Sequence, residues 1–407
     1  MILNIKPAKI FKGQIRLPAS KSYSIRAFII AACGGRSHII HPSNCEDALV
    51  ARNISNALKK KTKVFNVGES GTSLRFLLPL LPFCTNRTTI KGKGTLIGRP
   101  NHHLCESLRR QGINIQGSGL KESVPIVYKG GQLKGGTIKI DGTLSSQFIS
   151  ALLIALPRFE EDSQIIITGK EMVSADYIVM TNQILAKAGI RIQQLTSRKY
   201  FIKGNQKFKG LKNFIVPSDY GLAAFPMAAA SLLQSNIVLK GYLKDDLIQS
   251  DEHIMKFLKT MGVKYKKTDI SISIKGSFNL KGGTFSLKNC PDLVPIMAVL
   301  ALFAKGQTKL VDIFHARAKE SDRISDVRSE LLKIGANVKE TSNALIINPK
   351  NTYKTNQILD SHHDHRLAMA WTVLGMKIGC QIKGIESCRK SYPDFVKDME
   401  SLGLRYT

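Results

Sequence analysis

Residues 145–156 read SSQFISALLIAL, a cluster of small polar residues followed at once by an apolar segment. Serine is a common helix N-cap, because its hydroxyl accepts a hydrogen bond from a backbone N–H of the first turn. The rest of the segment is apolar on every face, so we expect a helix buried inside a layer of other elements. The polar first turn of such a helix then faces a cleft.

The same pattern recurs five more times along the chain. The further copies are SKSYSIRAFIIAA (20–32), SGTSLRFLLPLL (70–81), DYGLAAFPMAAASLL (219–233), DLVPIMAVLALFA (292–304) and DHRLAMAWTVLGM (364–376). From the second start onward the interval is 72 to 75 residues, whereas the first interval is 50 residues. A fixed period of this length indicates a repeated supersecondary unit.

A second set of predicted helices recurs at nearly the same interval as the first. Each of them ends at a glycine followed by a short strand. These glycines are Gly112, Gly189, Gly262, Gly335 and Gly403, which we predict to terminate the helices, because glycine adopts the left-handed backbone at no steric cost. The lead-in LKGGT also occurs twice, at 133–137 and at 280–284. The sequence therefore predicts six copies of one α/β unit, in two groups of three.

Length and composition fit this reading. The 407 residues suggest two or three domains, and 43% hydrophobic with 22% charged residues is ordinary for a globular protein. The seven cysteines form no C-x-x-C pair, which favours a reducing compartment, and neither a secretory signal nor a membrane helix is evident. We expect a cytosolic protein.

The net charge of +30 is compatible with nucleic acid, a membrane surface or small anionic substrates. The lysines are scattered, aromatic residues make up only 7%, and no nucleic-acid-binding motif occurs. Several helix N-termini facing one cleft favour small anions instead, because their N–H groups are unpaired and their dipoles positive. No glycine-rich phosphate loop is present, so the helix starts would take its place.

Three short stretches carry candidate chemistry, and each also has a plain structural explanation. In LPASKSYSIRA (17–27), Lys21 and Arg26 suit a phosphate, but Arg26 is equally well explained as a surface charge. In AKESDR (318–323), Glu320 and Arg323 share a helical face, as an ordinary ion pair would. In SHHDHR (361–366), adjacent histidines point in different directions, so we predict no metal site there.

Together these stretches resemble the 5-enolpyruvylshikimate-3-phosphate (EPSP) synthase family from end to end. The resemblance rests on nine motifs in the family's order: PASKSYSIRA, GESGTSLR, IGRP, IDGTLSSQFISALL, VSADY, NCPDLVP, RAKESDR, DHRLAMA and KSYPDF. It implies a two-domain α/β fold, an inside-out α/β barrel of six β-α-β-α-β-β units with the active site in the interdomain cleft. One domain would comprise residues 1–18 and 218–407 and the other residues 19–217, with crossings near Ala19 and Pro217.

The resemblance also implies the reaction. The enolpyruvyl group of phosphoenolpyruvate would be transferred to the 5-hydroxyl of shikimate 3-phosphate, by addition and then elimination of phosphate, in the shikimate pathway. No metal or organic cofactor would be required. We expect a monomer that acts on these two small anions, with neither nucleic acid nor membrane as a partner, and that glyphosate inhibits.

The family's functional residues carry over by motif. Phosphoenolpyruvate would be bound by Lys21, Gly71, Arg99, Gln147, Arg323, Arg366 and Lys390. Shikimate 3-phosphate would be bound by Lys21, Ser22, Arg26, Ser145, Ser146, Gln147, Ser174, Tyr177, Asp292, His315 and Lys319. Asp292 would be the base for the 5-hydroxyl, and Glu320 with Lys21 would donate a proton to the methylene carbon.

Some positions depart from the family pattern. Ile25, Glu69 and His315 stand where asparagine is frequent, and Pro217-Ser218-Asp219 replaces a frequent Glu-Gly-Asp. His315 still offers a hydrogen bond to the ligand, whereas Glu69 adds a negative charge beside an anion site, so we leave it out of the binding set.

Three other functions are open to test. A UDP-N-acetylglucosamine enolpyruvyl transferase would share the fold, but no counterpart of its uridine diphosphate sugar site or its cysteine loop is found. An anion-binding module would not need both Asp292 and Glu320, and a nucleic-acid binder would not need the repeated helix starts.

Overall fold

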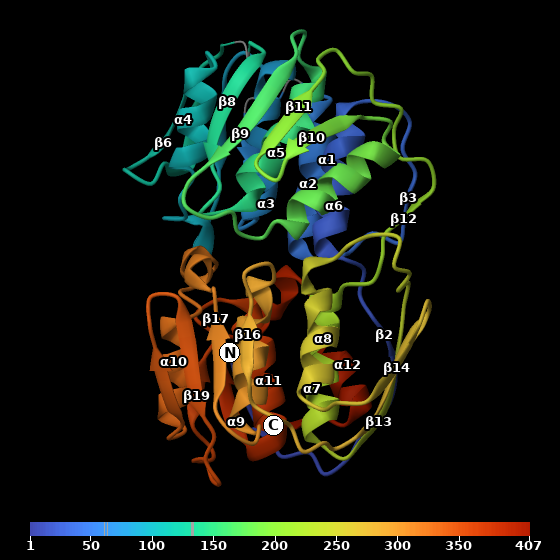
Figure 1. Ribbon diagram of the computed structural model, residues 1–407, viewed down its shortest axis with the longest axis vertical. Coiled ribbons are helices and arrows are strands. Elements are labelled where there is room, and N and C mark those ends of the chain that lie inside the picture. The colour runs from blue at the N-terminus through green and yellow to red at the C-terminus, as the bar shows by residue number, and fades with distance from the viewer. Residues whose placement is uncertain (61, 63, 132–133) are drawn as a thin grey trace. The chain divides into compact units, whose positions relative to one another are not determined.

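The computed structural model describes residues 1–407 except 61, 63, 132 and 133. The chain divides into two compact units (Figure 1). The discontinuous unit consists of Met1–Pro18 and Pro217–Thr407, and the inserted unit consists of Ala19–Val216. Each unit is described by itself below.

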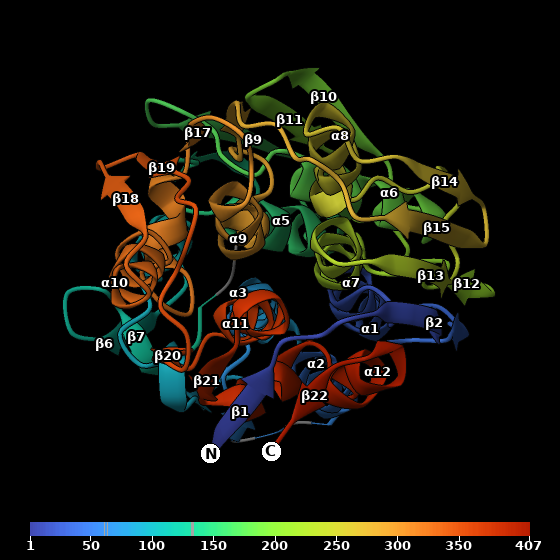
Figure 2. The same cartoon turned by 90° about the horizontal axis from the view of Figure 1, so that it is seen from below.

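Three apolar helices form the centre of the discontinuous unit. These are α7 (Tyr220–Leu232), α9 (Val294–Leu302) and α11 (His365–Ile378), and each packs against the other two. Figure 2 shows them end-on, with strands at the periphery. Every residue of α7 and α9 is buried, because both helices are apolar on all sides. The predicted burial of these helices is confirmed.

Three four-stranded sheets and three outer helices surround this centre. The first sheet has the order β14 (Tyr265–Thr268), β15 (Ser271–Gly276), β13 (Ser235–Lys240), β2 (Phe11–Arg16), and the second β16 (Thr284–Ser286), β17 (Thr308–Val311), β19 (Ala344–Asn348), β18 (Asn337–Glu340). The third has the order β20 (Ile358–Asp360), β21 (Cys380–Lys383), β1 (Ile2–Lys6), β22 (Arg405–Tyr406). The outer helices are α8 (His253–Thr260), α10 (Ser325–Lys333) and α12 (Phe395–Leu402).

The N-terminal segment completes two of these sheets. Strand β2 pairs in parallel with β13, in the register Phe11 to Ser235 and Arg16 to Lys240. Strand β1 pairs antiparallel with both β21 and β22. Residues from the start of the chain are therefore built into the same unit as residues after 217.

The inserted unit repeats this plan with a difference. Its inner helices are α1 (Lys21–Cys33), α3 (Gly71–Leu77) and α5 (Ser146–Ala155), and its outer helices are α2 (Glu46–Leu58), α4 (His102–Arg110) and α6 (Asp176–Lys187). Two sheets have four strands, with the orders β4 (Val64–Asn66), β5 (Thr88–Lys91), β7 (Ser123–Tyr128), β6 (Ile115–Ser118) and β10 (Ile192–Thr196), β11 (Lys199–Ile202), β9 (Ser163–Thr168), β8 (Gly136–Asp141). The third contains only β12 (Phe214–Ile215) and β3 (Ile39–Ile40), paired in parallel.

The prediction of six complete copies is therefore wrong for one of them. Four copies have the order β-α-β-α-β-β along the chain, and in the copy with α11 and α12, which ends at β22, strand β1 from the start of the chain takes the place of the last strand. Among the described residues, the copy with α1 and α2 has no strand between Leu58 and β4 at Val64. An interval of 50 residues, against 72 to 75 elsewhere, leaves too little chain for two more strands. Within the described residues the strands form separate sheets around the inner helices and not one closed barrel.

The predicted glycine terminators are confirmed. All five have positive φ, from 78° at Gly335 to 124° at Gly403, the region that favours glycine. The second LKGGT leads into β16, while the first begins at Leu133, which lies outside the described residues. Over the part of the chain that the structure describes, no helix combines the length and the apolar character needed to cross a lipid bilayer.

Candidate active site

Asp292 stands at the start of a short 3-10 helix, η5 (Pro291–Leu293), immediately before α9. The N-cap residues of η5 and α9 are Cys290 and Leu293, so Asp292 holds neither position. By contrast, Asp219 is the N-cap of α7 and accepts a hydrogen bond from the N–H of Leu222 at 3.0 Å, and Asp364 caps α11. Asp292 therefore does not open its helix in the same way as Asp219, and its carboxylate contacts side chains from other segments of the unit.

Those partners are arginines, and the first is Arg323. Its side chain is completely buried and donates to Asp292 Oδ1 at 2.6 Å, to Asp364 Oδ2 at 2.7 Å and to Glu320 Oε2 at 3.1 Å. Burial by itself lowers the pKa of Arg323, but Asp364, Asp292 and Glu320 together raise it well above its ordinary value. Arg323 therefore stays charged and holds three carboxylates together.

The segment that carries Glu320 and Arg323 is not helical. Residues 319–323 form a loop between η6 (Phe314–Ala318) and α10, so the predicted shared helical face is wrong. The ion pair itself exists, because the loop brings the buried Arg323 Nη2 to 3.1 Å from Glu320 Oε2. Tertiary contact, and not helical spacing, brings the two charges together.

Arg366 is the second arginine on Asp292. It lies in the first turn of α11 and donates to Asp292 Oδ2 at 3.2 Å and to the carbonyl of Gly221 at 2.6 Å. Its Nε is buried and has no acceptor among the described residues. Because a buried donor without a partner costs free energy, this side chain is suited to receive an acceptor from outside the protein.

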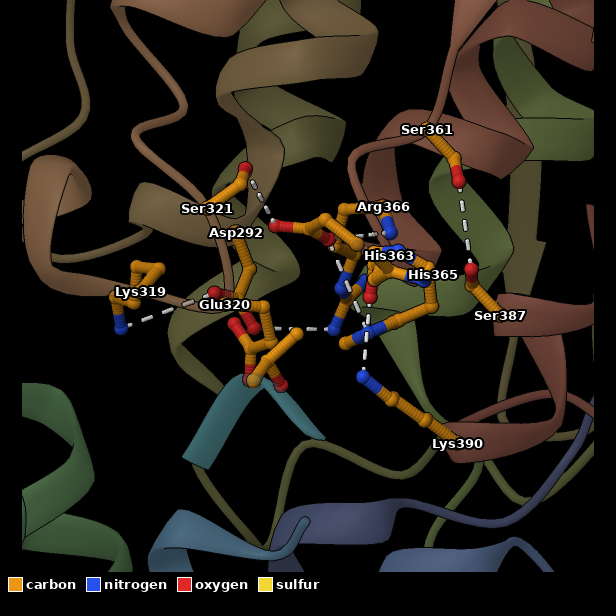
Figure 3. Close-up of polar contacts among 12 residues, drawn as sticks. Asp292, Lys319, Glu320, Ser321, Ser361, His363, His365, Arg366, Ser387 and Lys390 are labelled. Atoms are coloured by element: carbon orange, nitrogen blue, oxygen red, sulfur yellow. Dashed lines mark hydrogen bonds and ion pairs between the residues drawn. The ribbon is translucent and has the colours of Figure 1, made fainter. Parts of the chain in front are cut away.

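Two lysines flank the carboxylates (Figure 3). Lys319 Nζ lies 3.8 Å from Asp292 Oδ1, and Lys390 donates to the carbonyl of His363 at 3.0 Å. In Figure 3, Asp292 and Glu320 lie between these two lysines. The discontinuous unit thus brings together six of its seven predicted site residues around Asp292.

The seventh, His315, is buried with 2% of its surface exposed, and its Nε2 has no partner among the described residues. Burial, followed by the nearby Lys319, lowers the pKa of His315 to about 3. The imidazole is therefore neutral at working pH and offers one N–H and one lone pair.

We expect replacement of His315 by asparagine to make the protein less sensitive to acid. Below about pH 6.5 the unfolded chain protonates this histidine whereas the folded chain does not until about pH 3. The contribution of this group to the free energy of unfolding is therefore fully present above pH 6.5, and it falls by about 3 kcal/mol by pH 4. Urea unfolding of both proteins at pH 7 and pH 4 measures the difference, with His41→Asn at an exposed histidine as the control. An equal loss of stability in all three proteins would contradict the expectation.

In the inserted unit, Ser20 caps α1 and accepts from the N–H of Tyr23 at 3.4 Å. This places Lys21 and Ser22 in the first helical turn. Lys21 Nζ lies 3.1 Å from Asp47 Oδ2, and both side chains are mostly buried. Asp47, which sequence reasoning did not select, therefore orients Lys21 and partly neutralises it.

Arg26 is not a surface charge. It is buried and donates to Thr181 Oγ1 at 2.9 Å and to the carbonyls of Ser22 and Tyr177, both at 3.1 Å. Burial lowers the pKa of Arg26 to about 10, and among the described residues no carboxylate pairs with it. A buried cation held only by neutral oxygens favours an anionic ligand.

The N-termini of α3 and α5 carry a second group of predicted residues. Ser145 caps α5 through the N–H of Gln147 at 3.3 Å, which places Ser146 in its first turn. The Gln147 side chain accepts from Arg75 at 2.5 Å and donates to Thr72 at 2.9 Å. Arg75 was not selected from the sequence, yet it fixes the orientation of a predicted ligand residue.

Gly71, at the start of α3, contacts the guanidinium of Arg99. A Cβ on Gly71 would lie 2.8 Å from Arg99 Nη1, so the guanidinium would have to shift if this residue had a side chain. Glu69 accepts hydrogen bonds from the N–H and hydroxyl of Thr95, at 3.1 and 2.9 Å. Glu69, which departs from the family pattern, therefore holds in place the segment that leads to Arg99.

Ser174 and Tyr177 lie where the chain enters α6. Ser174 has φ of 55°, an uncommon value for a residue with a side chain, and its carbonyl accepts from the N–H of Tyr177 at 3.1 Å. The Tyr177 ring lies near Arg26, with the guanidinium 5.7 Å from the ring centre. These residues and Arg26 therefore form one group within the inserted unit.

The structure adds four polar residues to those that the sequence indicated: Asp47, Arg75, Asp251 and Asp364. Asp364 was visible as a helix start, but its pairing with buried Arg323 was not. No sequence signal separates Asp47 or Asp251 from ordinary surface acids, because each is followed or preceded by another acidic residue.

Comparison with known proteins gives a consistent result. Residues 43–399 match the sequence profile of EPSP synthase (3-phosphoshikimate 1-carboxyvinyltransferase). The chain is 34% identical to the 3-phosphoshikimate 1-carboxyvinyltransferase of Methanococcus maripaludis over 99% of both chains. It is 35% identical to that of Methanocaldococcus jannaschii, over 99% of this chain and 98% of the relative.

Solved structures agree. An EPSP synthase from Acinetobacter baumannii superposes with a TM-score of 0.79 at 26% identity, covering 100% of this chain and 99% of the other. The enolpyruvyl transferase NikO from Streptomyces tendae, at 15% identity, shares the fold, with a TM-score of 0.77 over 100% and 98% of the two chains. With its repeated α/β units and the motifs of both units in the family's order, the chain belongs to the EPSP synthase family.

Proposed function

We propose that this chain transfers the enolpyruvyl group of phosphoenolpyruvate to the 5-hydroxyl of shikimate 3-phosphate, releasing phosphate. The relatives with the same name support this reaction. The observation that carries the proposal is that Asp292 and Glu320 both accept hydrogen bonds from the buried Arg323. Arg366 and Lys319 lie beside Asp292. Two carboxylates among several cations suit proton transfer on anionic substrates.

In the proposed mechanism Asp292 accepts the proton of the 5-hydroxyl. At the same time the hydroxyl oxygen bonds to the vinyl carbon of phosphoenolpyruvate. Glu320, with Lys21, gives a proton to the methylene carbon, which completes the addition. The methyl group so formed then loses one proton to the Glu320 carboxylate, the bond to phosphate breaks, and the double bond re-forms. The proton on Asp292 passes to solvent, so the group is ready for the next turnover.

The remaining roles follow from charge and geometry. We propose that Arg99, Arg323, Arg366 and Lys390 bind the phosphate and carboxylate of phosphoenolpyruvate, because arginine forks match planar oxyanions and lysine acts as a point charge. Gly71, Gln147 and Lys21 would complete that set.

Shikimate 3-phosphate would be bound through hydroxyls and helix N-termini. We assign it to Ser22, Arg26, Ser145, Ser146, Ser174, Tyr177, His315 and Lys319, together with Lys21, Gln147 and Asp292. Buried Arg26, which has no carboxylate partner among the described residues, supports a phosphate in this group. We further propose that the two compact units are the two domains, divided at 18/19 and at 216/217, one residue before the predicted 217/218. We also propose that the enzyme acts as a monomer on these small anions.

Release of inorganic phosphate on mixing purified protein with both substrates tests the function. We expect phosphate only when shikimate 3-phosphate and phosphoenolpyruvate are both present. Release with UDP-N-acetylglucosamine in place of shikimate 3-phosphate would support the sister activity instead, and no release with either acceptor would overturn the proposal.

We expect Gly71→Ala to weaken glyphosate more than phosphoenolpyruvate. The added methyl must displace the Arg99 guanidinium, which it would approach to 2.8 Å, and glyphosate, slightly longer than the substrate, has less room to adjust. The inhibition constant of glyphosate and the KM of phosphoenolpyruvate, measured on both proteins, give the comparison. Equal changes in the two constants would contradict the expectation.

A further inference from the structure

A fourth carboxylate, Asp251, lies beside Arg366. It belongs to the 3-10 helix η4 (Ser250–Glu252) and is 7% exposed. Its Oδ2 lies 3.8 Å from Arg366 Nη2, the same nitrogen that donates to Asp292 at 3.2 Å. Its Oδ1 is buried without a hydrogen-bond partner among the described residues. Asp251 therefore caps no helix through this oxygen, and its ion-pair partner is the guanidinium of Arg366.

Gly221 makes this approach possible. It lies in the first turn of α7, and a Cβ there would stand 2.3 Å from Asp251 Oδ2 and 2.9 Å from Arg366 Nη1. Its carbonyl accepts from Arg366 Nη1 at 2.6 Å. Arg366 is thus enclosed by Gly221, Asp251 and Asp292, while its buried Nε has no acceptor among the described residues.

The electrostatics of Asp251 follow from this enclosure. Burial raises the pKa of Asp251 to about 7, and the like charge of Asp292 adds to the effect. Arg366 and Lys319 oppose the shift, and Asp219 at the start of α7 supports it. An anion arriving at Arg366 adds further negative charge beside Asp251, so the carboxylate will hold a proton more strongly.

We propose that Asp251 is a positioning residue that competes with the anionic substrate for Arg366, and that substrate binding there is coupled to uptake of one proton from solvent by the Asp251 carboxylate. In the free protein, ionised Asp251 holds the guanidinium against the carbonyl of Gly221. When an oxyanion binds, the protonated carboxyl no longer neutralises Arg366. The inference rests on the proposed role of Arg366 in binding phosphoenolpyruvate.

The test compares the KM of phosphoenolpyruvate in wild type and Asp251→Asn between pH 6 and pH 8. Asparagine has nearly the same shape but stays neutral, so it does not compete for Arg366 at any pH. We expect the ratio of wild-type KM to variant KM to rise about tenfold from pH 6 to pH 8, because binding then requires protonation of a group that titrates near pH 7. Ionisation of the substrate itself cancels in this ratio.

Glu252→Gln is the matched control. Glu252 is the next residue in the same turn, but its carboxylate lies 3.6 Å from Lys267 instead of beside Arg366. We expect its KM to follow wild type at every pH. The proposal is overturned if the ratio of wild-type KM to Asp251→Asn KM stays constant within twofold between pH 6 and pH 8. It is also overturned if the KM values of both variants depend on pH in the same way. A wild-type protein that releases no phosphate would instead overturn the proposed function.

A measurement on the wild-type protein does not depend on the folding of any variant. With aspartate labelled by carbon-13 at the side-chain carboxyl, we expect one resonance to titrate near pH 7 and to move to higher pH when phosphoenolpyruvate is added. If no aspartate titrates above pH 6, or if the titration does not move on addition, the proposal is wrong.

Discussion

Replacing Asp292 with asparagine will lower kcat for phosphate release by about 10²- to 10⁴-fold, the usual size of a general-base contribution. The carboxylate lies between Arg323 and Arg366, and Asp292 is the N-cap residue of neither η5 nor α9. Asparagine keeps the shape of the side chain but cannot accept the proton of the 5-hydroxyl. Steady-state kinetics with both substrates, at constant pH, measures the loss.

Asp219→Asn is the control, because Asp219 stands at the equivalent helix start 73 residues earlier in the chain. Its carboxylate accepts from the N–H of Leu222 at 3.0 Å, and asparagine caps a helix about as well as aspartate. We expect this variant to keep most of its activity and its melting temperature. The assignment of Asp292 fails if both variants lose kcat equally at unchanged stability.

Arg323→Met will lower the free energy of unfolding by about 3 to 5 kcal/mol, because removing one partner of a buried ion pair leaves uncompensated buried charge. Arg323 is fully buried and holds Asp292, Asp364 and Glu320. Asp364 is itself fully buried, so its carboxylate cannot be solvated when the guanidinium is gone. Urea denaturation at neutral pH gives the free energy.

The matched control is Arg317→Met, in the same segment. Arg317 pairs with Asp322 at 2.8 Å, but 24% of its side chain and 36% of that of Asp322 are exposed. We expect a smaller loss than for Arg323→Met, because the carboxylate left behind can be solvated. Equal destabilisation of the two variants would show that burial of the ion-pair network adds nothing to stability.

The repeated units were predictable because each depends on local chemistry. Polar residues before an apolar run mark a helix start, and glycine after it supplies positive φ, as at Gly112 and Gly335. The short first interval was visible in the sequence, but six equal copies were predicted all the same. The element order of the described residues shows that the copy with α1 and α2 has no strand between Leu58 and Val64.

Asp292 shows where local reasoning failed. The sequence places it like Asp219, at the start of an apolar segment, but a 3-10 turn that begins at Pro291 precedes α9. Its carboxylate accepts hydrogen bonds from Arg323 and Arg366, which come from segments 31 and 74 residues further along the chain. Such pairing depends on the fold and not on the local sequence, and Asp364 makes both kinds of contact, because it caps α11 and pairs with Arg323.

The family and most helix starts could be predicted from the sequence, since both lie in short motifs, and the same motifs supply the residues that we propose to bind the substrates. The polar partners of those residues could be seen only in the folded structure, where Asp47 contacts Lys21, Arg75 contacts Gln147 and Asp251 contacts Arg366. The physical reason is that ion pairing and burial depend on distance in space. Asp251 resembles any surface acid in the sequence, and it becomes a buried competitor for Arg366 because α7 approaches closely enough at Gly221 to enclose it.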